Sequence, residues 1–191
     1  MGDRPPGEVT RILEAVATGE ARAAGQLLDL VYDELRRLAG ARMAGESPGQ
    51  TLQPTALVHE AYLRLFRGKT PKFENRAHFF TAAAEAMRRV LVDRARERRR
   101  LKRGGDRLRV TFDEGMARHD ATPEEFLDID EALRNLEAHD ADMANVVKLR
   151  YFAGLTLEET AETLGSSRST IARSWRAARA WLQRELTHGE A

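Results

Sequence analysis

The stretch GLTLEETAETLGSSRSTIARSWRAARAWLQREL, residues 154–186, decides the fold of the second half of this 191-residue chain. Leu157, Ala161 and Leu164 recur at helical spacing within it. Gly165 can supply the backbone turn that follows, and a Ser-rich segment can then cap a second helix. A helix, a turn and a second helix make up the helix-turn-helix motif. We therefore predict this motif in the stretch.

The second helix of this motif has an apolar face and a cationic face. Its apolar residues recur every three or four positions, so they must pack on neighbouring helices; they are Ile171, Trp175, Ala178, Leu182 and Leu186. Five arginines and no acid lie between Arg168 and Arg184. A helix that lies against DNA phosphates while its first turns read base edges carries such a charge. The candidate DNA contacts are Arg168, Ser169, Thr170, Arg173, Arg176 and Arg179.

The alternative interpretation of this helix is a solvated cationic helix in an ordinary bundle. A solvated face normally mixes charges of both signs, whereas this face carries one sign. The pattern therefore favours contact with nucleic acid.

The composition excludes several classes of protein. The chain has no cysteine, which excludes a disulfide framework and a thiolate metal site. Residues 1–8 are polar and contain two prolines, unlike a signal peptide. No apolar run approaches the ~18 residues that a membrane span needs. We expect a cytoplasmic protein with no membrane segment.

The net charge of +1 is unevenly distributed along the chain. Residues 88–109 contain eleven Lys or Arg and three acids, a balance of +8. Residues 113–142 contain eleven acids and two arginines, a balance of −9. This alternation predicts basic surfaces for DNA joined by an anionic connector.

The hydrophobic periodicity predicts an all-α fold made of two small helical domains. In the first half we expect helices over about 9–17 and 20–43, a third after Pro54 with the apolar stripe Leu57, Ala61, Tyr62 and Leu65, and a fourth from Arg76 to the glycines at 104 and 105. In the second half, Ile129, Leu133 and Leu136 mark a short helix, and 143–152 is apolar enough for a buried one. The helix-turn-helix completes a four-helix unit.

The domain boundaries follow from this pattern. We place the first domain at 8–103, a flexible acidic linker at 104–127 and the second domain at 128–187. The linker has no sustained period and is rich in acids. Its charge predicts that it competes with DNA for the basic regions and is partly self-inhibitory.

No pattern supports an enzyme, a cofactor or a metal site. His59 and Glu60 begin like a zinc-protease helix, but Leu63 stands where the second His would be. The other histidines are scattered, and no Gly-rich phosphate loop is present.

The chain resembles the bacterial RNA polymerase sigma factors of the extracytoplasmic-function (ECF) group in the sigma-70 family. The resemblance rests on LVHEAYLRLF at 57–66, an aromatic loop after it, LVDRARERRR at 91–100 and the helix-turn-helix. It implies binding to core RNA polymerase, at the beta-prime clamp helices and the beta flap, and to promoter DNA. The first domain would recognise the minus-ten element and melt the promoter, and the second would read the minus-thirty-five element.

Promoter melting gives the first domain its own requirements: surface for unstacked bases and cations for the single strand. The candidate residues are Phe73, Asn75, Arg76, Arg94 and Arg98. Phe79 and Phe80 could stack on bases, but their helical spacing with Ala83 favours a place in the core.

The polymerase contact departs from the family pattern. The resemblance implies contacts from Thr55, Leu57, Val58, Glu60 and Leu63, yet residues 53–56 lack the acids that this family usually carries there. Thr55 lies in an expected first helical turn, where an anion is favoured. Phosphorylation of Thr55 by a Ser/Thr kinase would supply the missing charge, and an anti-sigma factor is a further expected partner. A plain helix start at 53–56 is the other interpretation.

Two other functions remain open at this stage. A dimeric helix-turn-helix repressor or activator would bind a palindromic duplex alone, whereas a sigma factor would comigrate with core polymerase. A helical scaffold with a cationic surface would do neither.

Overall fold

The computed structural model describes residues 6–20, 22–43, 53–67, 72–101 and 123–188. Every regular element in these ranges is helical, so the fold is all-α as predicted. The elements are α1 (Pro6–Ala17), α2 (Ala23–Met43), α3 (Pro54–Leu65), α4 (Arg76–Leu101), α5 (Pro123–His139), α6 (Ala141–Val147), the π-helical segment η1 (Lys148–Phe152), α7 (Leu157–Thr163) and α8 (Arg168–His188).

The first half, residues 6–101, packs its helices through the stripes expected from the sequence. On α2 the buried residues include Leu27, Val31, Leu35 and Leu38. On α3 they include Leu57, Ala61 and Tyr62, while Leu65 is partly buried. The Tyr62 hydroxyl donates a hydrogen bond to the carbonyl of Ala24, which joins α3 to α2. Burial and the charge of Asp29 raise the pKa of this hydroxyl to about 12, so it remains a donor at neutral pH.

The second half, residues 123–188, begins earlier than the sequence indicated. Pro123 opens α5, and a proline at the first helical position costs little because its missing N–H would be unpaired there. Residues 123–127, assigned to the linker from the sequence, are therefore helical. The rest of the predicted linker up to residue 122 lies outside the described residues.

The buried segment predicted at 143–152 is two elements and not one helix. The Asp140 side chain caps α6 by accepting a hydrogen bond from the Met143 amide at 2.8 Å. The chain then widens into η1, where the Ala153 amide donates to the Lys148 carbonyl at 3.1 Å. All five residues of η1 are buried, including the charged Lys148 and Arg150.

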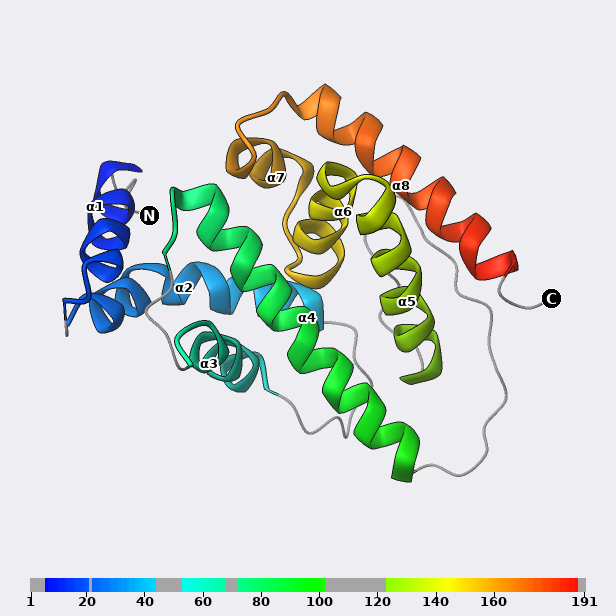
Figure 1. The fold of residues 1–191 in the computed structure, drawn as a ribbon, viewed down its shortest axis with the longest axis horizontal. Coiled ribbons are helices and arrows are strands. Elements are labelled where there is room, and N and C mark those ends of the chain that lie inside the picture. The colour runs from blue at the N-terminus through cyan, green and yellow to red at the C-terminus, as the bar shows by residue number, and fades with distance from the viewer. Residues whose placement is uncertain (1–5, 21, 44–52, 68–71, 102–122, 189–191) are drawn as a thin grey trace.

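The two halves share one continuous hydrophobic core. In Figure 1, α4 crosses the molecule between α3 on one side and α5 and α6 on the other. It contacts α3 in its own half, and α5, η1 and α7 in the second half. The helix that carries the basic segment of the first half is therefore also the main junction between the halves.

Candidate nucleic-acid and partner interfaces

Side-chain caps define the starts of α7 and α8. Thr156 and Glu159 form a reciprocal capping box at the start of α7, with bonds of 3.1 and 2.8 Å. Gly165 adopts φ +61° in the turn, a conformation that side chains disfavour. The Ser167 hydroxyl then accepts from the Thr170 amide at 3.1 Å and caps α8. The two helices and the turn lie where the sequence predicted them.

The two faces of α8 differ in burial as predicted. Its inner face consists of Ile171, Trp175, Ala178 and Leu182, which are buried, and the partly buried Leu186. Arg173 and Arg176 are exposed on the helix, and neither forms an ion pair with another described residue. These two guanidinium groups are available to an anionic partner.

The other candidate residues of α8 already have partners. The Arg168 guanidinium donates a hydrogen bond to Glu158 on α7, and this bond lowers the pKa of Glu158. The Ser169 and Thr170 hydroxyls lie 2.8 and 2.9 Å from the Ser167 hydroxyl. Arg179 is half-buried. Arg168 is exposed and uses its Nε–H in this contact, so its other guanidinium N–H groups can still face DNA.

Arg150 packs against the inner side of the helix-turn-helix. The sequence analysis did not predict this role. It is buried, donates to the Leu155 carbonyl at 3.1 Å and lies 5.0 Å from the Trp175 ring centroid. Burial lowers its pKa, with the Arg179 charge acting in the same direction and Glu158 opposing it. An arginine inside a mostly apolar segment was the sequence signal for this role.

Three of the residues predicted for promoter melting, Phe73, Asn75 and Arg76, lie at or just before the start of α4. Asn75 caps α4 by accepting from the His78 amide at 2.8 Å. Arg76 pairs with Glu34 of α2 at 2.8 Å, and its guanidinium lies 4.7 Å from the Phe80 ring centroid. Phe73 is buried, and its ring centroid lies 5.2 Å from that of Phe79. The Phe73 ring is therefore not open to solvent, as a stacking surface for bases would be. Its ring fills the space where the loop returns to the core.

Phe79 and Phe80 are also buried, which confirms their predicted place in the core.

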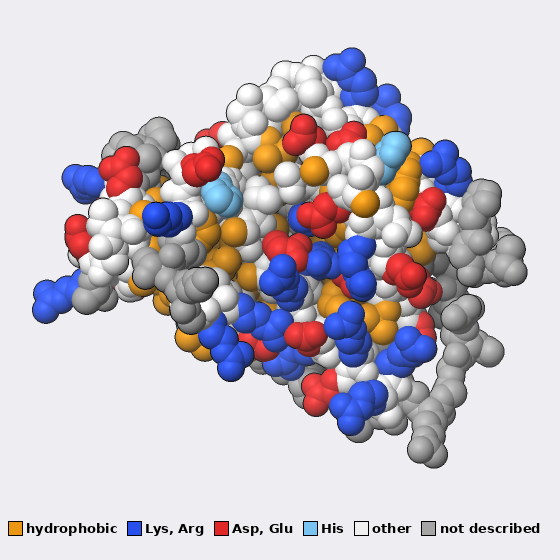
Figure 2. Space-filling view, in the orientation of Figure 1, with side chains coloured by type: hydrophobic (Ala, Val, Ile, Leu, Met, Phe, Trp, Pro, Cys, Tyr) orange, Lys and Arg blue, Asp and Glu red, His pale blue; other side chains and the backbone are white. Residues whose placement is uncertain are grey.

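The C-terminal part of α4 presents cations. Arg94 pairs with Glu60 of α3 at 3.2 Å, and Arg98 is half-buried. Arg99 and Arg100 are exposed and form no ion pair with another described residue. Figure 2 shows Lys and Arg side chains gathered over α4 and α5 with acids between them, and further basic side chains along the outer edge at α8.

The α3 residues predicted to contact polymerase divide into two groups. Leu57 and Val58 are fully buried, because they fill the space between α3 and its neighbours α2 and α4; they are core residues and not surface contacts. Leu63 is 70% exposed. Among the described residues, it is the one large hydrophobic side chain that is exposed to solvent. Glu60 is half-buried and is shared between Arg94 and Arg64.

Thr55 lies half-buried in the first turn of α3, directly after Pro54. Gln53, at the N-cap, makes no side-chain hydrogen bond to the helix. The first-turn amides of α3 therefore receive no cap from that side chain.

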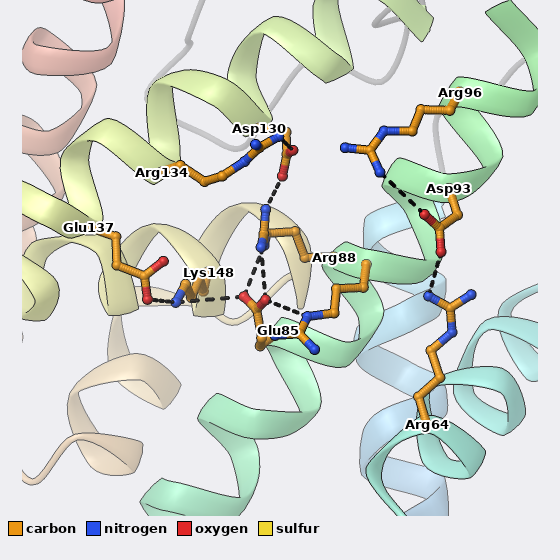
Figure 3. Close-up of polar contacts among 10 residues, drawn as sticks. Arg64, Glu85, Arg88, Asp93, Arg96, Asp130, Arg134, Glu137 and Lys148 are labelled. Carbon is orange, nitrogen blue, oxygen red and sulfur yellow. Dashed lines mark hydrogen bonds and ion pairs between the residues drawn. The ribbon is translucent and has the colours of Figure 1, made fainter. Parts of the chain in front are cut away.

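A buried ionic network joins α4 to the second half, and the sequence analysis did not predict it (Figure 3). Glu85 accepts hydrogen bonds from Arg88 at 2.8 and 2.9 Å and from Arg89 at 2.8 Å, and it lies 3.6 Å from Lys148. Arg88 also donates to Asp130 of α5. Burial would raise the pKa of Glu85, but the bonds and charge of these cations outweigh it and lower the pKa to about 2.

The fold and these surfaces define an all-helical DNA-binding protein with a helix-turn-helix. The sequence profile described as ECF sigma factor matches residues 6–188, so the chain belongs to the ECF sigma factor family and functions in transcription initiation. No curated protein sequence matches the chain. Among the described helices, none is both long enough and apolar enough to cross a membrane.

Proposed function

We propose that this sigma factor binds core RNA polymerase, directs it to a specific set of promoters and nucleates strand opening through its first half. The observation that carries the proposal is the outer face of α8. Arg173 and Arg176 are exposed there without an ion pair to another described residue, while the opposite face is anchored in the core. A helix held in this way can enter a major groove without rearrangement of the domain.

Position along α8 gives its candidate residues different tasks. Arg168, Ser169, Thr170 and Arg173 occupy the first two turns and would contact base edges of the minus-thirty-five element. Arg176 and Arg179 lie further along and would contact phosphates, which contribute affinity without sequence preference.

The start and the end of α4 would hold the melted strand. Asn75, Arg94 and Arg98 offer hydrogen bonds and charge to its backbone. Arg76 would first have to leave Glu34, and Phe73 could stack on a base only after its ring left the core. The proposal therefore includes a local rearrangement of the segment before α4 when single-stranded DNA binds.

The exposed side of α3 would bind polymerase. Leu63 offers an apolar contact, and Glu60 would offer a negative one once it leaves Arg64 and Arg94. Both residues are on the same helix as Thr55. Leu57 and Val58 would contribute indirectly, because their packing in the core holds α3 in place.

Phosphorylation of Thr55 is proposed as the control of this contact. Its hydroxyl makes no hydrogen bond with another described residue, and the first turn of α3 contains no acid. A phosphate there would meet the positive end of the helix dipole and would add about −1.5 to −2 of charge to the polymerase-binding side.

Reconstituted transcription tests the proposed function. The purified full chain is mixed with core polymerase and supercoiled promoter DNA, taken from start sites mapped after overproduction of the chain. Promoter-specific transcripts that require both the chain and core polymerase would support it. A chain that binds a palindromic duplex alone, fails to comigrate with core polymerase and yields no transcripts would be a conventional repressor or activator.

A further inference from the structure

An ion pair between Glu158 and Arg168 joins the two helices of the helix-turn-helix. We infer that Glu158 is a positioning residue: it holds the Arg168 guanidinium in the orientation that reads a guanine in the major groove. Because α8 must enter that groove for this to happen, the role rests on the proposed function. Glu158 would set base preference without contacting DNA itself.

The donor that Arg168 uses determines which of its N–H groups remain for a base. Its Nε–H donates to the Glu158 carboxylate. A guanidinium can offer two parallel N–H groups either along the edge that includes Nε or from its two terminal nitrogens. Because Nε is occupied, the two terminal nitrogens remain, with two N–H groups each.

Guanine is the base that such a pair of donors fits. Its O6 and N7 are neighbouring acceptors on the major-groove edge, and an arginine that donates to both is the commonest specific contact with DNA. Adenine presents N7 beside an amino donor, cytosine presents an amino donor, and thymine presents one acceptor beside a methyl group. Each of these three bases would leave at least one N–H group of a fixed guanidinium unpaired.

Both residues lie at helix starts that side-chain caps hold in place. Glu158 is in the first turn of α7, between Thr156 and Glu159, which form the capping box. Arg168 is the first residue of α8 and directly follows Ser167, whose hydroxyl caps that helix. The two backbones are therefore fixed relative to one another, and the bond between the side chains confines the guanidinium to a narrow range of positions.

The place of Arg168 at a helix start requires a compensating acid. The positive end of the helix dipole disfavours a cation there. The first turn of α8 contains no acid, so Glu158 supplies the negative charge from α7. The hydrogen bond from Arg168 and, more weakly, the charge of Arg150 lower the pKa of Glu158, so its carboxylate is ionised at neutral pH.

Arg173 and Arg176 have no comparable support. Both are exposed, and neither forms an ion pair with another described residue. Each must lose side-chain entropy when it contacts DNA, whereas Arg168 has lost part of this freedom before binding. A side chain that a second residue holds in its binding geometry discriminates more sharply between ligands. Base preference along α8 should therefore be strongest where Arg168 docks.

The pair should contribute more in the complex than in the free protein. The side chains of Arg168 and Glu158 are 65% and 62% exposed, and an exposed ion pair is weak in water. DNA that covers the pair would exclude water, lower the local dielectric constant and strengthen the attraction. Substitution of either residue should thus leave the fold unchanged and appear mainly in DNA recognition.

The test measures promoter binding by polymerase that contains the full chain or a variant. The DNA is a promoter from mapped start sites, with a panel of single-base variants of its minus-thirty-five element. For the wild type we expect one guanine whose replacement weakens binding about tenfold or more, and Arg168→Ala should remove that preference. Glu158→Ala should reduce it to about threefold or less, whereas Glu158→Gln, which keeps an oxygen acceptor, should retain most of it.

Glu162→Ala is the matched control. Glu162 is an exposed acid on the same helix, and it forms no ion pair with another described residue. Removal of either acid takes a negative charge away from the DNA phosphates, so both Ala variants should bind the non-preferred sequences slightly more tightly. Only Glu158→Ala should lose discrimination at the guanine, because a purely electrostatic effect would change all sequences alike.

The double variant decides whether Glu158 acts through Arg168. If it does, Glu158→Ala should change no base preference once Arg168→Ala is present, because the two residues act as one unit. A guanine preference that survives Glu158→Ala or Arg168→Ala, or equal effects of Glu158→Ala and Glu162→Ala, would overturn the positioning role and leave the proposed function in place. Absence of polymerase-dependent promoter binding by every form, the wild type included, would overturn both.

Discussion

Arg88 of α4 donates a hydrogen bond to Asp130 of α5, which lies 42 positions further along the chain. Both residues are buried, and they belong to different halves of the protein. The pair therefore couples the folding of one half to its contact with the other, and its removal should appear in both stability and shape.

Replacement of Asp130 and replacement of Arg88 should both lower the free energy of unfolding, but by different amounts. Asp130→Asn leaves Arg88 with Glu85, so we expect a loss of about 1–3 kcal/mol. Arg88→Met leaves Asp130 and Glu85 without their shared cation, so we expect about 3–5 kcal/mol. Urea denaturation measures both. Arg134→Gln, an exposed partner of Asp130, should cost about 0.5 kcal/mol or less, and an equal loss in all three variants would contradict this ranking.

Acid should weaken the same junction through Glu85. The pKa of Glu85 is lowered from 4.5 to about 2 in the folded protein, so the unfolded chain takes up the proton at higher pH than the folded one does. Its stabilisation is therefore complete above about pH 4.5 and is lost as the pH falls toward 2.

The measurement compares the wild type with Glu85→Gln at pH 6 and pH 3. The difference in unfolding free energy between them should shrink at the lower pH, because the variant lacks this carboxyl group while the other carboxyl groups titrate in both proteins. The charged groups that face Glu85 are Arg88, Arg89 and Lys148. A difference that stays constant would show that Glu85 titrates normally.

Local periodicity predicted most of the helices, although it missed the start of α5 and the division of 143–152 between α6 and η1. The stripes of α2 and α8 and the turn at Gly165 depend on residues within a few positions of one another, and spacing records such relations directly. The predicted burial of Phe79 and Phe80 was confirmed for the same reason. Burial of Leu57 followed from the apolar stripe predicted for α3, whereas Val58 was not part of that stripe. The family resemblance had suggested a surface role for both residues.

Contacts between distant segments could not be predicted in this way. Nothing in the sequence near Arg88 specifies Asp130 as its partner, because the pair depends on how α5 packs on α4. Charge blocks did indicate that acids compete for the basic regions, but that competition was assigned to the linker, most of which lies outside the described residues. Arg168 illustrates the same limit, since its pairing with Glu158 depends on the angle between α7 and α8.

Arg173 and Arg176 should differ in how they affect DNA binding. Arg173→Ala should cost about 1–3 kcal/mol at one position of the minus-thirty-five element, because a base contact is lost. Arg176→Ala should weaken binding to all sequences alike and reduce the salt dependence, because a phosphate contact is lost. Binding of polymerase containing each variant to a panel of single-base promoter variants separates the two. Unchanged activity of Arg173→Ala at every promoter would rule out this docking of α8.

Leu63 and Leu57 form a matched pair on α3. Leu63→Ala should leave the unfolding free energy within about 0.5 kcal/mol of the wild type, because the side chain is already exposed. It should weaken binding to core polymerase about tenfold if that apolar surface is buried in the complex. Leu57→Ala should instead cost about 2–5 kcal/mol of stability, because it leaves a cavity. Unchanged polymerase affinity in Leu63→Ala would move the contact to another face of the helix.

Negative charge at Thr55 should strengthen the polymerase contact. Thr55→Glu adds one charge in the first turn of α3, where the helix dipole favours an anion by about 0.3–1 kcal/mol, on the side of the protein that we propose faces polymerase. We expect Thr55→Glu to bind core polymerase more tightly than the wild type, Thr55→Ala to bind like the unmodified wild type, and the phosphorylated protein to bind most tightly, because a phosphate carries more charge and more acceptor oxygens than a carboxylate.

The control is Thr18→Glu, which makes the same substitution at an exposed threonine just after α1 and should leave polymerase affinity unchanged. Surface plasmon resonance with immobilised core polymerase compares all five forms at one ionic strength, because the contact depends on screened charge. Equal affinities for the phosphorylated, Glu and Ala forms would make Thr55 an ordinary residue at a helix start. Equal strengthening by Thr18→Glu would mean that polymerase responds to net charge and not to charge at α3.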